Sequence, residues 1–307
     1  MYRVLILQNQ LPAYRVPFFK ALSASNREVT VAHCQSIVEE YSEFHQVRLP
    51  KVSVGGLFWQ RGVHRLSRDY DIVVGMFNVR WISTILLQLS PFRRPRFVYW
   101  GIGLGKSRLA NRMKLILARL SEKVIVYSDS GRAALIDAGV VPEHVLVAPN
   151  TVHVTEAAMA RAEAADRRTS IVTLGRLGSR KQIDVILREF HRQLPRLPAD
   201  LTFDIVGDGP QQGYLENLRD ELGLQSRVRF LGSIEVDEQL AEIFSRALAS
   251  ISYGQAGLSV IHSLAFGVPV LVGKGAISGG ESEAIVDGKT GFVCDSPEDV
   301  FERVRLL

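Results

Sequence analysis

The sequence predicts an α/β protein built from two doubly wound, Rossmann-like parallel-sheet domains. Short apolar, β-rich runs alternate with segments of helical periodicity along most of the chain. The length of 307 residues suits two domains of ordinary size. A stretch poor in large apolar residues, 154–168, interrupts the alternation near the middle. We therefore expect one domain over residues 1–155, another over 168–307, and a central cleft between them.

The composition excludes several classes of protein. With 47% hydrophobic and 22% charged residues, the chain is typical of a globular protein rather than a disordered or fibrous one. Cys34 and Cys294 are the two cysteines, and they have no metal-type spacing. The first residues turn polar too early for a signal peptide, and no run of about 18 apolar residues occurs. These features predict a cytoplasmic protein.

The charge is distributed unevenly. Residues 1–160 hold 20 Lys and Arg against 11 Asp and Glu, whereas residues 161–307 hold 17 against 21. The basic first half indicates an anionic partner, such as lipid headgroups or an anionic acceptor. No recognised nucleic-acid-binding motif is present, so we expect no nucleic-acid partner.

The first half reads as a series of strands joined by helices. A less regular region reaches to about Val63, with Gly55-Gly56 as a turn signal. Helices are expected from Phe18 and over Trp81–Leu89 and 107–120. The strands are Tyr2–Leu7, Glu28–Cys34, Asp71–Gly75, Arg96–Trp100, Lys123–Tyr127 and Val145–Ala148.

Two motifs in this half resemble known sites without matching them. Asp69-Tyr70-Asp71 has the Asp-x-Asp form of a metal–nucleotide site. Because it precedes a strand, away from the expected ligand edge, it is interpreted as an ordinary polar segment before that strand. The stretch 100–107 resembles a phosphate loop, yet Trp100 stands where the first glycine is required. It remains a glycine-rich turn after a strand, where backbone amides can approach a substrate.

The helix over 107–120 has two interpretations. It is either a surface helix with its apolar stripe on the core, or a helix whose basic face touches an anionic membrane, and the two are compatible. The stripe comprises Leu109, Met113, Ile116, Leu117 and Leu120. The basic residues are Lys106, Arg108, Arg112, Lys114 and Arg119, four of which (Arg108, Arg112, Lys114 and Arg119) would meet the membrane.

The second half restarts the alternation after a linker or edge helix over 154–168. Its first strand breaks at Gly175 into a basic loop that contains Arg176 and Lys181, and a helix follows. A strand end, two cations and a helix N-terminus form a site for a phosphate, and a second, matching stretch downstream favours this interpretation over a merely solvated basic turn. The strands are Ser170–Leu174, Leu201–Val206, Arg229–Leu231, Ala249–Tyr253, Val268–Gly273 and Gly291–Cys294.

A second strand–loop–helix unit lies downstream. The loop Gly254–Gly257 leads into a helix from about Leu258, which Ser259 is expected to cap. His262 lies one turn further and is either a ligand-facing histidine or a satisfied core histidine. Gly279-Gly280-Glu281 forms a flexible loop beyond the next strand.

Five motifs carry a family resemblance, and they follow one another through residues 170–295. They are Gly175-Arg-Leu with Lys181, Val206-Gly-Asp-Gly-Pro210, Phe230-Leu-Gly232, Gly257-Leu-Ser with Ala265-Phe-Gly-Val-Pro-Val270, and Glu283-Ala-Ile-Val-Asp-Gly-Lys-Thr-Gly291. Together they resemble family 4 glycosyltransferases. The resemblance implies the GT-B fold, with two Rossmann-like domains facing a central cleft, and sugar transfer with retention of anomeric configuration.

The resemblance also implies roles for individual residues. Arg176 and Lys181 would hold the donor diphosphate without a metal or other cofactor, and His262 would contact the donor ribose. The donor site would take in Gly175, Gly207, Arg229, Gly232, Gly257, Leu258 and Ser259. The acceptor side would take in Arg15, Trp100, Gly101 and Gly103. The first glutamate of the family's Glu-x7-Glu pair falls on Gly254, and an acceptor-side histidine falls near Ile102.

These observations lead to one hypothesis and three alternatives. The hypothesis is a hexosyltransferase that takes its sugar from a nucleotide-diphosphate sugar. It would build cell-surface polysaccharide, such as lipopolysaccharide, on a glycan or lipid-linked acceptor at the inner face of the cytoplasmic membrane. Gly254 and Ile102 favour the first alternative, a degenerate member that binds a nucleotide or partner without turnover. The second is an epimerase, which would need Glu281 or Glu283 to activate water. The third, a dehydrogenase, is weak because no Gly-x-Gly-x-x-Gly follows the first strand.

Overall fold

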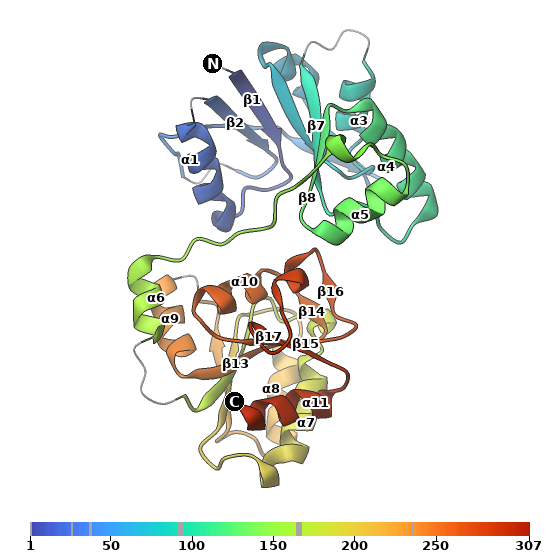
Figure 1. Ribbon diagram of the computed structural model, residues 1–307. Coiled ribbons are helices and arrows are strands. Elements are labelled where there is room, and N and C mark those ends of the chain that lie inside the picture. Colours follow the sequence, from blue (N-terminus) through green and yellow to red (C-terminus); the bar gives the residue numbers. More distant parts are fainter. Residues whose placement is uncertain (1, 26, 37–38, 91–94, 164–167, 235) are drawn as a thin grey trace. The chain divides into compact units, whose positions relative to one another are not determined.

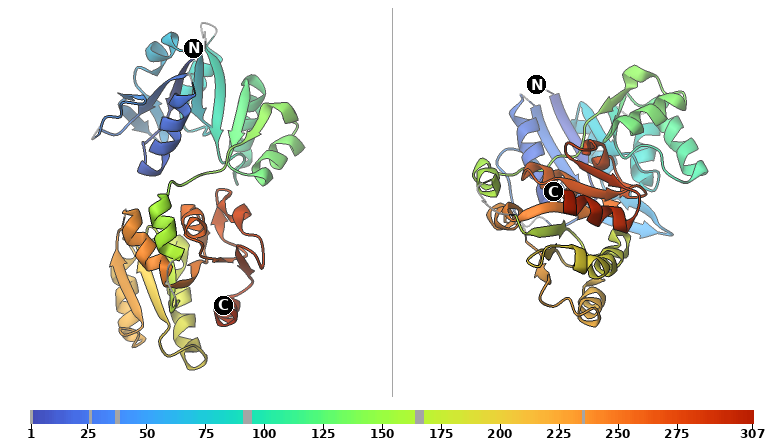
Figure 2. Two further views of the ribbon diagram at one scale, coloured as in Figure 1. Left: turned by 60° about the vertical axis from the view of Figure 1, so that its left-hand side comes forward. Right: turned by 60° about the horizontal axis from the view of Figure 1, so that its bottom comes forward.

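The computed structural model describes the chain except residues 1, 26, 37–38, 91–94, 164–167 and 235 (Figure 1). The chain divides into two compact units, Met1–Thr151 and Val152–Leu307. Each unit is an open parallel sheet with helices packed on it, as Figures 1 and 2 show. In the part of the chain that the structure describes, no helix combines the length and the apolarity needed to cross a bilayer.

The first unit contains a seven-stranded sheet in the order β3-β2-β1-β6-β7-β8-β9. All neighbouring strands in it are parallel. The strands are β1 (Tyr2–Leu7), β2 (Arg27–His33), β3 (His45–Arg48), β6 (Ile72–Met76), β7 (Arg96–Gly101), β8 (Lys123–Val126) and β9 (Val145–Val147). The α-helices are α1 (Val16–Ala24), α2 (Val63–Leu66), α3 (Ile82–Leu89), α4 (Arg108–Leu120) and α5 (Asp129–Asp137). Short 3-10 turns occupy η1 (Ala13–Arg15), η2 (Ser67–Asp69) and η3 (Pro142–His144).

Burial on both faces explains the continuous apolar runs of this sheet. Along β1, Leu5 and Leu7 belong to one apolar cluster, whereas Val4 and Ile6 belong to another. Because successive side chains of a strand point to opposite faces, the sheet is covered on both sides. Since helices cover both faces, a ligand-binding site is expected in the loops at the carboxyl ends of the strands.

The region before Val63 is more ordered than the sequence predicted. The strand β3 pairs with β2 and completes the sheet edge, although its sequence, His45-Gln-Val-Arg48, contains no apolar run. An antiparallel hairpin of β4 (Lys51–Val54) and β5 (Leu57–Gln60) turns at Gly55-Gly56, as expected. The carboxylate of Asp71 accepts a hydrogen bond from the backbone amide of Arg3, at 2.7 Å. This contact within the sheet is in keeping with its interpretation as part of an ordinary polar segment.

The second unit contains a six-stranded parallel sheet in the order β12-β11-β10-β13-β15-β17, with a small pair β14-β16 beside it. The strands are β10 (Ser170–Leu174), β11 (Thr202–Val206), β12 (Val228–Gly232), β13 (Ala247–Ser252), β14 (Gln255–Ala256), β15 (Val270–Gly273), β16 (Ile277–Ser278) and β17 (Gly291–Cys294). The α-helices are α6 (Glu156–Glu163), α7 (Ile183–Gln193), α8 (Gln212–Glu221), α9 (Asp237–Ser245), α10 (Leu258–Ala265) and α11 (Pro297–Leu306). The 3-10 turns are η4 (Ser179–Lys181), η5 (Leu194–Arg196) and η6 (Glu281–Ala284).

The stretch read as a linker or edge helix forms α6, which packs on the second unit (Figures 1 and 2). Ala158 and Ala162 are completely buried in one cluster with Ala241 and Phe244 of α9. Small alanines allow the two helices to approach closely, so few large apolar residues were needed to make this contact.

The helix α4 contradicts one expectation from the sequence. Leu117 and Ala118 are its buried residues, whereas Leu109 and Ile116, read as part of a core-facing stripe, are exposed. The helix therefore turns most of its apolar stripe to solvent. Ser107 caps its N-terminus by accepting a hydrogen bond from the backbone amide of Ala110.

Candidate functional site

Two glycine loops lie against each other at the carboxyl edge of the second sheet. Gly175 follows β10 and donates a backbone hydrogen bond to Val206 at 2.8 Å. Gly207 follows β11 and donates to the carbonyl of Gly232, the last residue of β12, at 2.7 Å. A Cβ atom on Gly207 would overlap the backbone of Gly175, so only glycine fits there. Three of the expected donor residues are thus brought together by the strand order.

Lys181 lies next to this junction as a half-buried cation. Its Nζ atom donates a hydrogen bond to the carbonyl of Leu174, at 2.6 Å, at the end of β10. Burial lowers the pKa of the Lys181 ammonium to about 8. Arg176, from the same loop, is exposed. One fixed, partly desolvated cation and one exposed guanidinium therefore flank the end of β10.

The loop before α10 touches the Lys181 loop directly. The backbone amide of Gly254 donates to the carbonyl of Lys181 at 3.1 Å. A Cβ atom on Gly254 would overlap the carbonyl oxygen of Arg180. Gly257, three residues after Gly254, is the N-cap of α10. The first backbone amides of that helix, which have no partner within the helix, therefore lie close in sequence to this contact. Lys181 and the positive end of a helix dipole are thereby held on neighbouring loops.

Ser259 does not cap α10, contrary to the prediction. The residue is buried inside the first turn, and no side chain makes a capping hydrogen bond at Gly257. The Ser259 hydroxyl lies 3.2 Å from the Ser252 hydroxyl at the end of β13. The hydroxyl pair therefore fastens the first turn of α10 to the end of β13.

Arg229 is also placed differently from its prediction. Its guanidinium makes two hydrogen bonds to the carboxylate of Asp204, at 2.7 and 2.8 Å. The two residues face each other across β11 and β12, short of the carboxyl ends at which Val206 pairs with Gly232. Asp204 is only 1% exposed, so Arg229 neutralises a buried charge. The structure does not bring Arg229 to the glycine loops.

His262 is half-buried on α10, one turn after the helix start. Burial lowers its pKa, while a hydrogen bond to the backbone of Leu258 and the negative charge of Asp237 oppose that shift. The side chain of Glu281 is buried beside the same helix and accepts a hydrogen bond from the amide of Gly279 at 2.9 Å. Glu281 also lies 3.3 Å from the hydroxyl of Ser278, which pairs with Ala256 in the loop after Gly254, whereas Glu283 is exposed.

The first unit holds a separate cluster at the carboxyl edge of its own sheet. Arg15 donates to the Oε1 atom of Gln8 at 2.8 Å and to the hydroxyl of Tyr127 at 2.9 Å. Its guanidinium also lies 4.7 Å from the ring centre of Trp100. The structure brings together Arg15 and Trp100, both expected on the acceptor side. Gln8 and Tyr127 were not predicted, although each follows directly on a strand end.

The glycine-rich loop after β7 is anchored to α4. Lys114 donates its Nζ hydrogen to the carbonyl of Gly103, and the Asn111 side chain bonds both the amide and the carbonyl of Gly105. Burial lowers the pKa of Lys114. Lys114 therefore points toward the loop, which removes it from the basic residues expected to meet a membrane. A Cβ atom on Gly101 would press against Phe77, and Ile102 is exposed.

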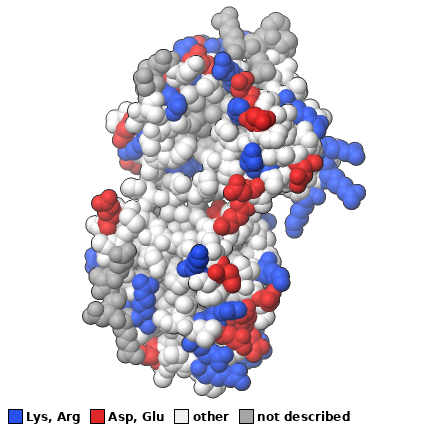
Figure 3. Space-filling view, viewed as in Figure 1, with Lys and Arg blue, Asp and Glu red and all other residues white. Residues whose placement is uncertain are grey.

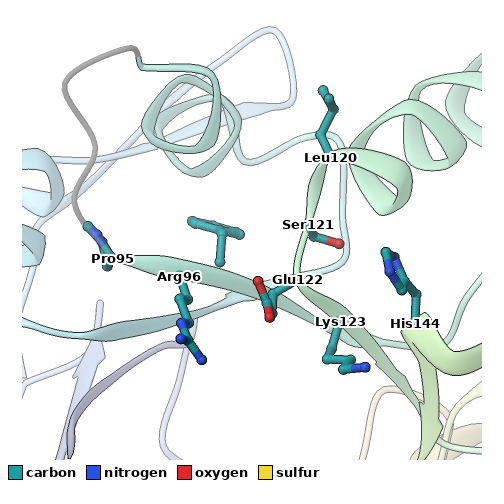
Figure 4. A pocket seen from close by; sticks show the side chains of 8 residues that line it. Pro95, Arg96, Leu120, Ser121, Glu122, Lys123 and His144 are labelled. Carbon is teal, nitrogen blue, oxygen red and sulfur yellow. The ribbon is translucent and has the colours of Figure 1, made fainter.

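A pocket of about 460 Å³ lies at the opposite edge of the first sheet (Figure 4). Its lining includes Arg96 at the start of β7 and Lys123 at the start of β8. Lys123 donates a hydrogen bond to the backbone carbonyl of Glu143 at 2.7 Å. This pocket is at the amino ends of the strands, whereas the glycine-rich loop after β7 follows a carboxyl end of the same sheet.

Comparisons of the sequence with known proteins find glycosyltransferases. A family model described as "Glycosyl transferases group 1" matches residues 154–307. A mannosyltransferase of Mycolicibacterium smegmatis, GDP-mannose-dependent and specific by name for phosphatidylinositol monomannoside, is 32% identical over 140 residues. That match covers 43% of this chain and 36% of the relative. The gpi3 subunit of phosphatidylinositol N-acetylglucosaminyltransferase from Schizosaccharomyces pombe is 27% identical over 171 residues, which is 51% of this chain and 37% of the relative. The chain thus spans well under half the length of these curated relatives.

Solved structures resemble the whole chain in fold. Anabaena HepE in complex with UDP has a TM-score of 0.75 at 18% identity, covering 100% of this chain and 89% of that one. WaaG, a glycosyltransferase involved in lipopolysaccharide biosynthesis, has a TM-score of 0.68 at 16% identity, covering 99% and 90%. The α/β fold with two parallel sheets, predicted from the sequence, is confirmed. Since the family model covers half of the chain and includes every glycine loop of the second unit, this protein belongs to the group 1 glycosyl transferases, the family 4 enzymes of GT-B fold.

Proposed function

We propose that this protein is a retaining hexosyltransferase that moves a sugar from a nucleotide-diphosphate sugar to a glycan or lipid-linked acceptor. The placement of Lys181 carries the proposal. Its ammonium is held at the end of β10, and its backbone carbonyl is bonded to Gly254 in the loop that precedes α10. A diphosphate at this place would meet a fixed cation and a helix N-terminus together.

The chemistry follows from charge. When the bond between the sugar's anomeric carbon and the phosphate oxygen breaks, negative charge grows on the departing nucleoside diphosphate. Preformed cations and amide dipoles stabilise such charge without reorganising. Arg176, Lys181 and His262 would act at the donor, with Lys181 and Arg176 on the diphosphate and His262 toward the ribose. The resemblance to metal-independent enzymes assigns this task to the side chains and to α10.

The donor site would be built from the glycine loops of the second unit. Gly207 donates a backbone hydrogen bond to Gly232 and packs closely against the backbone of Gly175. Gly257 and Leu258 would offer amides to the phosphates at the start of α10. Two observations bear on the nucleotide: the Mycolicibacterium smegmatis relative is named for GDP-mannose, and HepE was solved with UDP.

The acceptor would bind on the first unit, at Arg15, Trp100, Gly101 and Gly103. A guanidinium stacked on an indole ring offers both a flat apolar face and a cation to a sugar or an anionic acceptor. Two curated relatives carry phosphatidylinositol in their names, which supports a lipid-linked acceptor. We place the reaction in the synthesis of cell-envelope glycans or exopolysaccharide, lipopolysaccharide included, at the inner face of the cytoplasmic membrane.

A second candidate is a member of the same fold that binds nucleotide without turnover. The observation that favours it is the packing at Gly254, where Arg180 leaves no room for the family's first glutamate. The loss of that carboxylate would leave donor binding through Lys181 in place while removing a contact to the sugar.

Donor binding and hydrolysis, measured with UDP-, GDP-, TDP- and ADP-sugars, separate the two candidates. We expect tight binding of one nucleotide with slow release of its sugar, which a membrane lipid extract accelerates. Binding without release under both conditions would favour the degenerate member. A chain that binds none of the nucleotides would contradict the donor site itself.

A further inference from the structure

The pocket of about 460 Å³ in the first unit lies at the amino ends of three neighbouring strands. Arg96 begins β7, Lys123 begins β8, and His144 directly precedes β9. All three residues line the pocket, and β7, β8 and β9 are consecutive in the sheet. Because parallel strands begin at the same edge of a sheet, the strand order gathers an Arg, a Lys and a His side chain around one cavity.

The charged groups of this pocket do not pair with one another. Lys123 donates its hydrogen bond to a backbone carbonyl, that of Glu143. Among the residues that the structure describes, neither Arg96 nor Lys123 forms an ion pair with a carboxylate, although Glu122 lines the same pocket. Figure 4 shows the Glu122 carboxylate between the Arg96 and Lys123 side chains, with His144 to one side. Two cations and a carboxylate therefore face one cavity while remaining apart.

Enclosure, and not net charge, distinguishes this pocket from the surrounding surface. Basic and acidic side chains are interspersed on the face of the first unit that Figure 3 shows. In the pocket, by contrast, Lys123 and His144 are half-buried, and Phe97, which also lines it, is 1% exposed. The cavity volume falls in the range of about 300–1,000 Å³ that is typical of small-molecule sites.

The pocket also holds groups that accept hydrogen bonds. The carboxylate of Glu122 is one of them. The helix α4 ends at Leu120 in the pocket lining, so the partial negative charge of its carbonyl end lies here as well. The hydroxyl of Ser121 is already bonded to the carbonyl of Ala118, at 2.8 Å. A bare anion would meet these groups unfavourably, whereas a ligand that also carries hydroxyl donors would satisfy them.

We infer that this pocket is an accessory binding site for a phosphorylated sugar. Arg96 and Lys123 would hold the phosphate, because two cations match a dianion and a guanidinium can bind two of its oxygens at once. The Glu122 carboxylate would accept hydrogen bonds from the sugar hydroxyls, with the His144 imidazole beside it. The cavity belongs to the first unit, whereas the candidate donor loops belong to the second. The inference goes beyond the proposed transferase activity and does not rest on it.

Two elements connect this pocket to the glycine-rich loop after β7. The strand β7 runs from Arg96 in the pocket to Gly101, where that loop begins. The helix α4, which bonds to the loop through Lys114 and Asn111, ends at Leu120 in the pocket lining. A ligand in the pocket would therefore contact, and by mass action stabilise, both elements that carry the acceptor-side loop.

Isothermal titration calorimetry of the full chain, without nucleotide sugar, tests the inference. The probes are glucose 1-phosphate, glucose 6-phosphate and mannose 6-phosphate, with inorganic phosphate for comparison. We expect one hexose phosphate to bind about tenfold more tightly than inorganic phosphate. Arg96→Ala and Lys123→Ala should each raise its Kd about tenfold or more. Glu122→Gln should weaken the hexose phosphate but not inorganic phosphate, because the carboxylate would bind the sugar hydroxyls and repel the phosphate.

Two control variants separate this pocket from other sites. Arg65→Ala removes an exposed arginine elsewhere in the first unit, and Lys181→Ala removes the ammonium of the candidate donor site. Both should bind the hexose phosphate like the wild type, and unchanged melting temperatures would show that all variants fold.

Four results would overturn the inference. One is a wild-type chain that binds none of the hexose phosphates at millimolar concentration, and another is equal affinity in Arg96→Ala, Lys123→Ala and the wild type. The third is binding that Lys181→Ala abolishes, which would place the probe in the donor site. The fourth is inorganic phosphate bound as tightly as every hexose phosphate, which would contradict a sugar as part of the ligand.

Discussion

The amide of Gly254 donates a hydrogen bond to the carbonyl of Lys181, at 3.1 Å, and this contact joins the two loops that a donor diphosphate would touch. The absent side chain at Gly254 is what allows it, because a Cβ atom there would meet the carbonyl of Arg180. The same glycine that removes the family's glutamate therefore brings the cationic loop onto the loop before α10.

Substituting Gly254 should damage the fold rather than restore a family residue. Both Gly254→Ala and Gly254→Glu place an atom against backbone that cannot yield by a side-chain rotation, which we expect to cost about 2 kcal/mol of stability. Thermal unfolding measures this. Gly257→Ala is the control, because a Cβ atom there meets open space. Equal melting temperatures for the two alanine variants would refute the close packing at Gly254.

Removing the Lys181 ammonium should weaken nucleotide binding. A hydrogen bond to a charged group contributes about 1.5–3 kcal/mol, so Lys181→Ala should raise the Kd for the preferred nucleoside diphosphate roughly 10- to 100-fold. Isothermal titration calorimetry gives the value. Lys289→Ala removes an exposed lysine from the same unit and should leave the Kd unchanged. A Kd that is the same in Lys181→Ala and wild type would remove Lys181 from the donor site.

Nucleotide affinity should fall as the pH rises above neutrality. Burial lowers the pKa of Lys181 to about 8, so the free protein loses this positive charge as the pH passes through that value. Only the protonated form attracts a diphosphate, and the Kd should therefore rise between about pH 7 and pH 9. The variant Lys181→Arg keeps its charge throughout and should show a flat profile. An identical rise in that variant would assign the titration to another group.

Substituting Arg229 should lower the stability of the fold and leave the affinity for the donor nucleotide unchanged. Truncation by Arg229→Ala leaves the carboxylate of Asp204 buried and unpaired, and since Arg229 is itself half-exposed we expect a loss of about 2 kcal/mol. Lys274→Ala, which breaks a fully exposed pair with Asp295, should cost far less. Melting temperature and nucleotide Kd are measured on both. A raised nucleotide Kd with an unchanged melting temperature would instead show that Arg229 contributes to the donor site.

Local patterns in the sequence determined the larger part of the fold. Apolar runs located most strands of both sheets, and the glycine breaks at Gly175, Gly207 and Gly254 marked the loops that carry the candidate site. These signals are short-range, because the period of a strand or helix and the backbone freedom of glycine are properties of a few adjacent residues. The sequence motifs also pointed to the family that the comparisons show.

Tertiary structure alone decided which partner each side chain takes. Arg229 pairs with Asp204, twenty-five residues away in the sequence. The hydroxyl of Ser259 in α10 contacts that of Ser252 in β13. Lys114 donates a hydrogen bond to the carbonyl of Gly103 instead of projecting into solvent. Likewise, the periodicity of α4 revealed an apolar stripe but not the side on which the core lies. A helix presents its residues in a fixed order around its axis, whereas its rotation on the sheet depends on contacts made by segments distant in sequence.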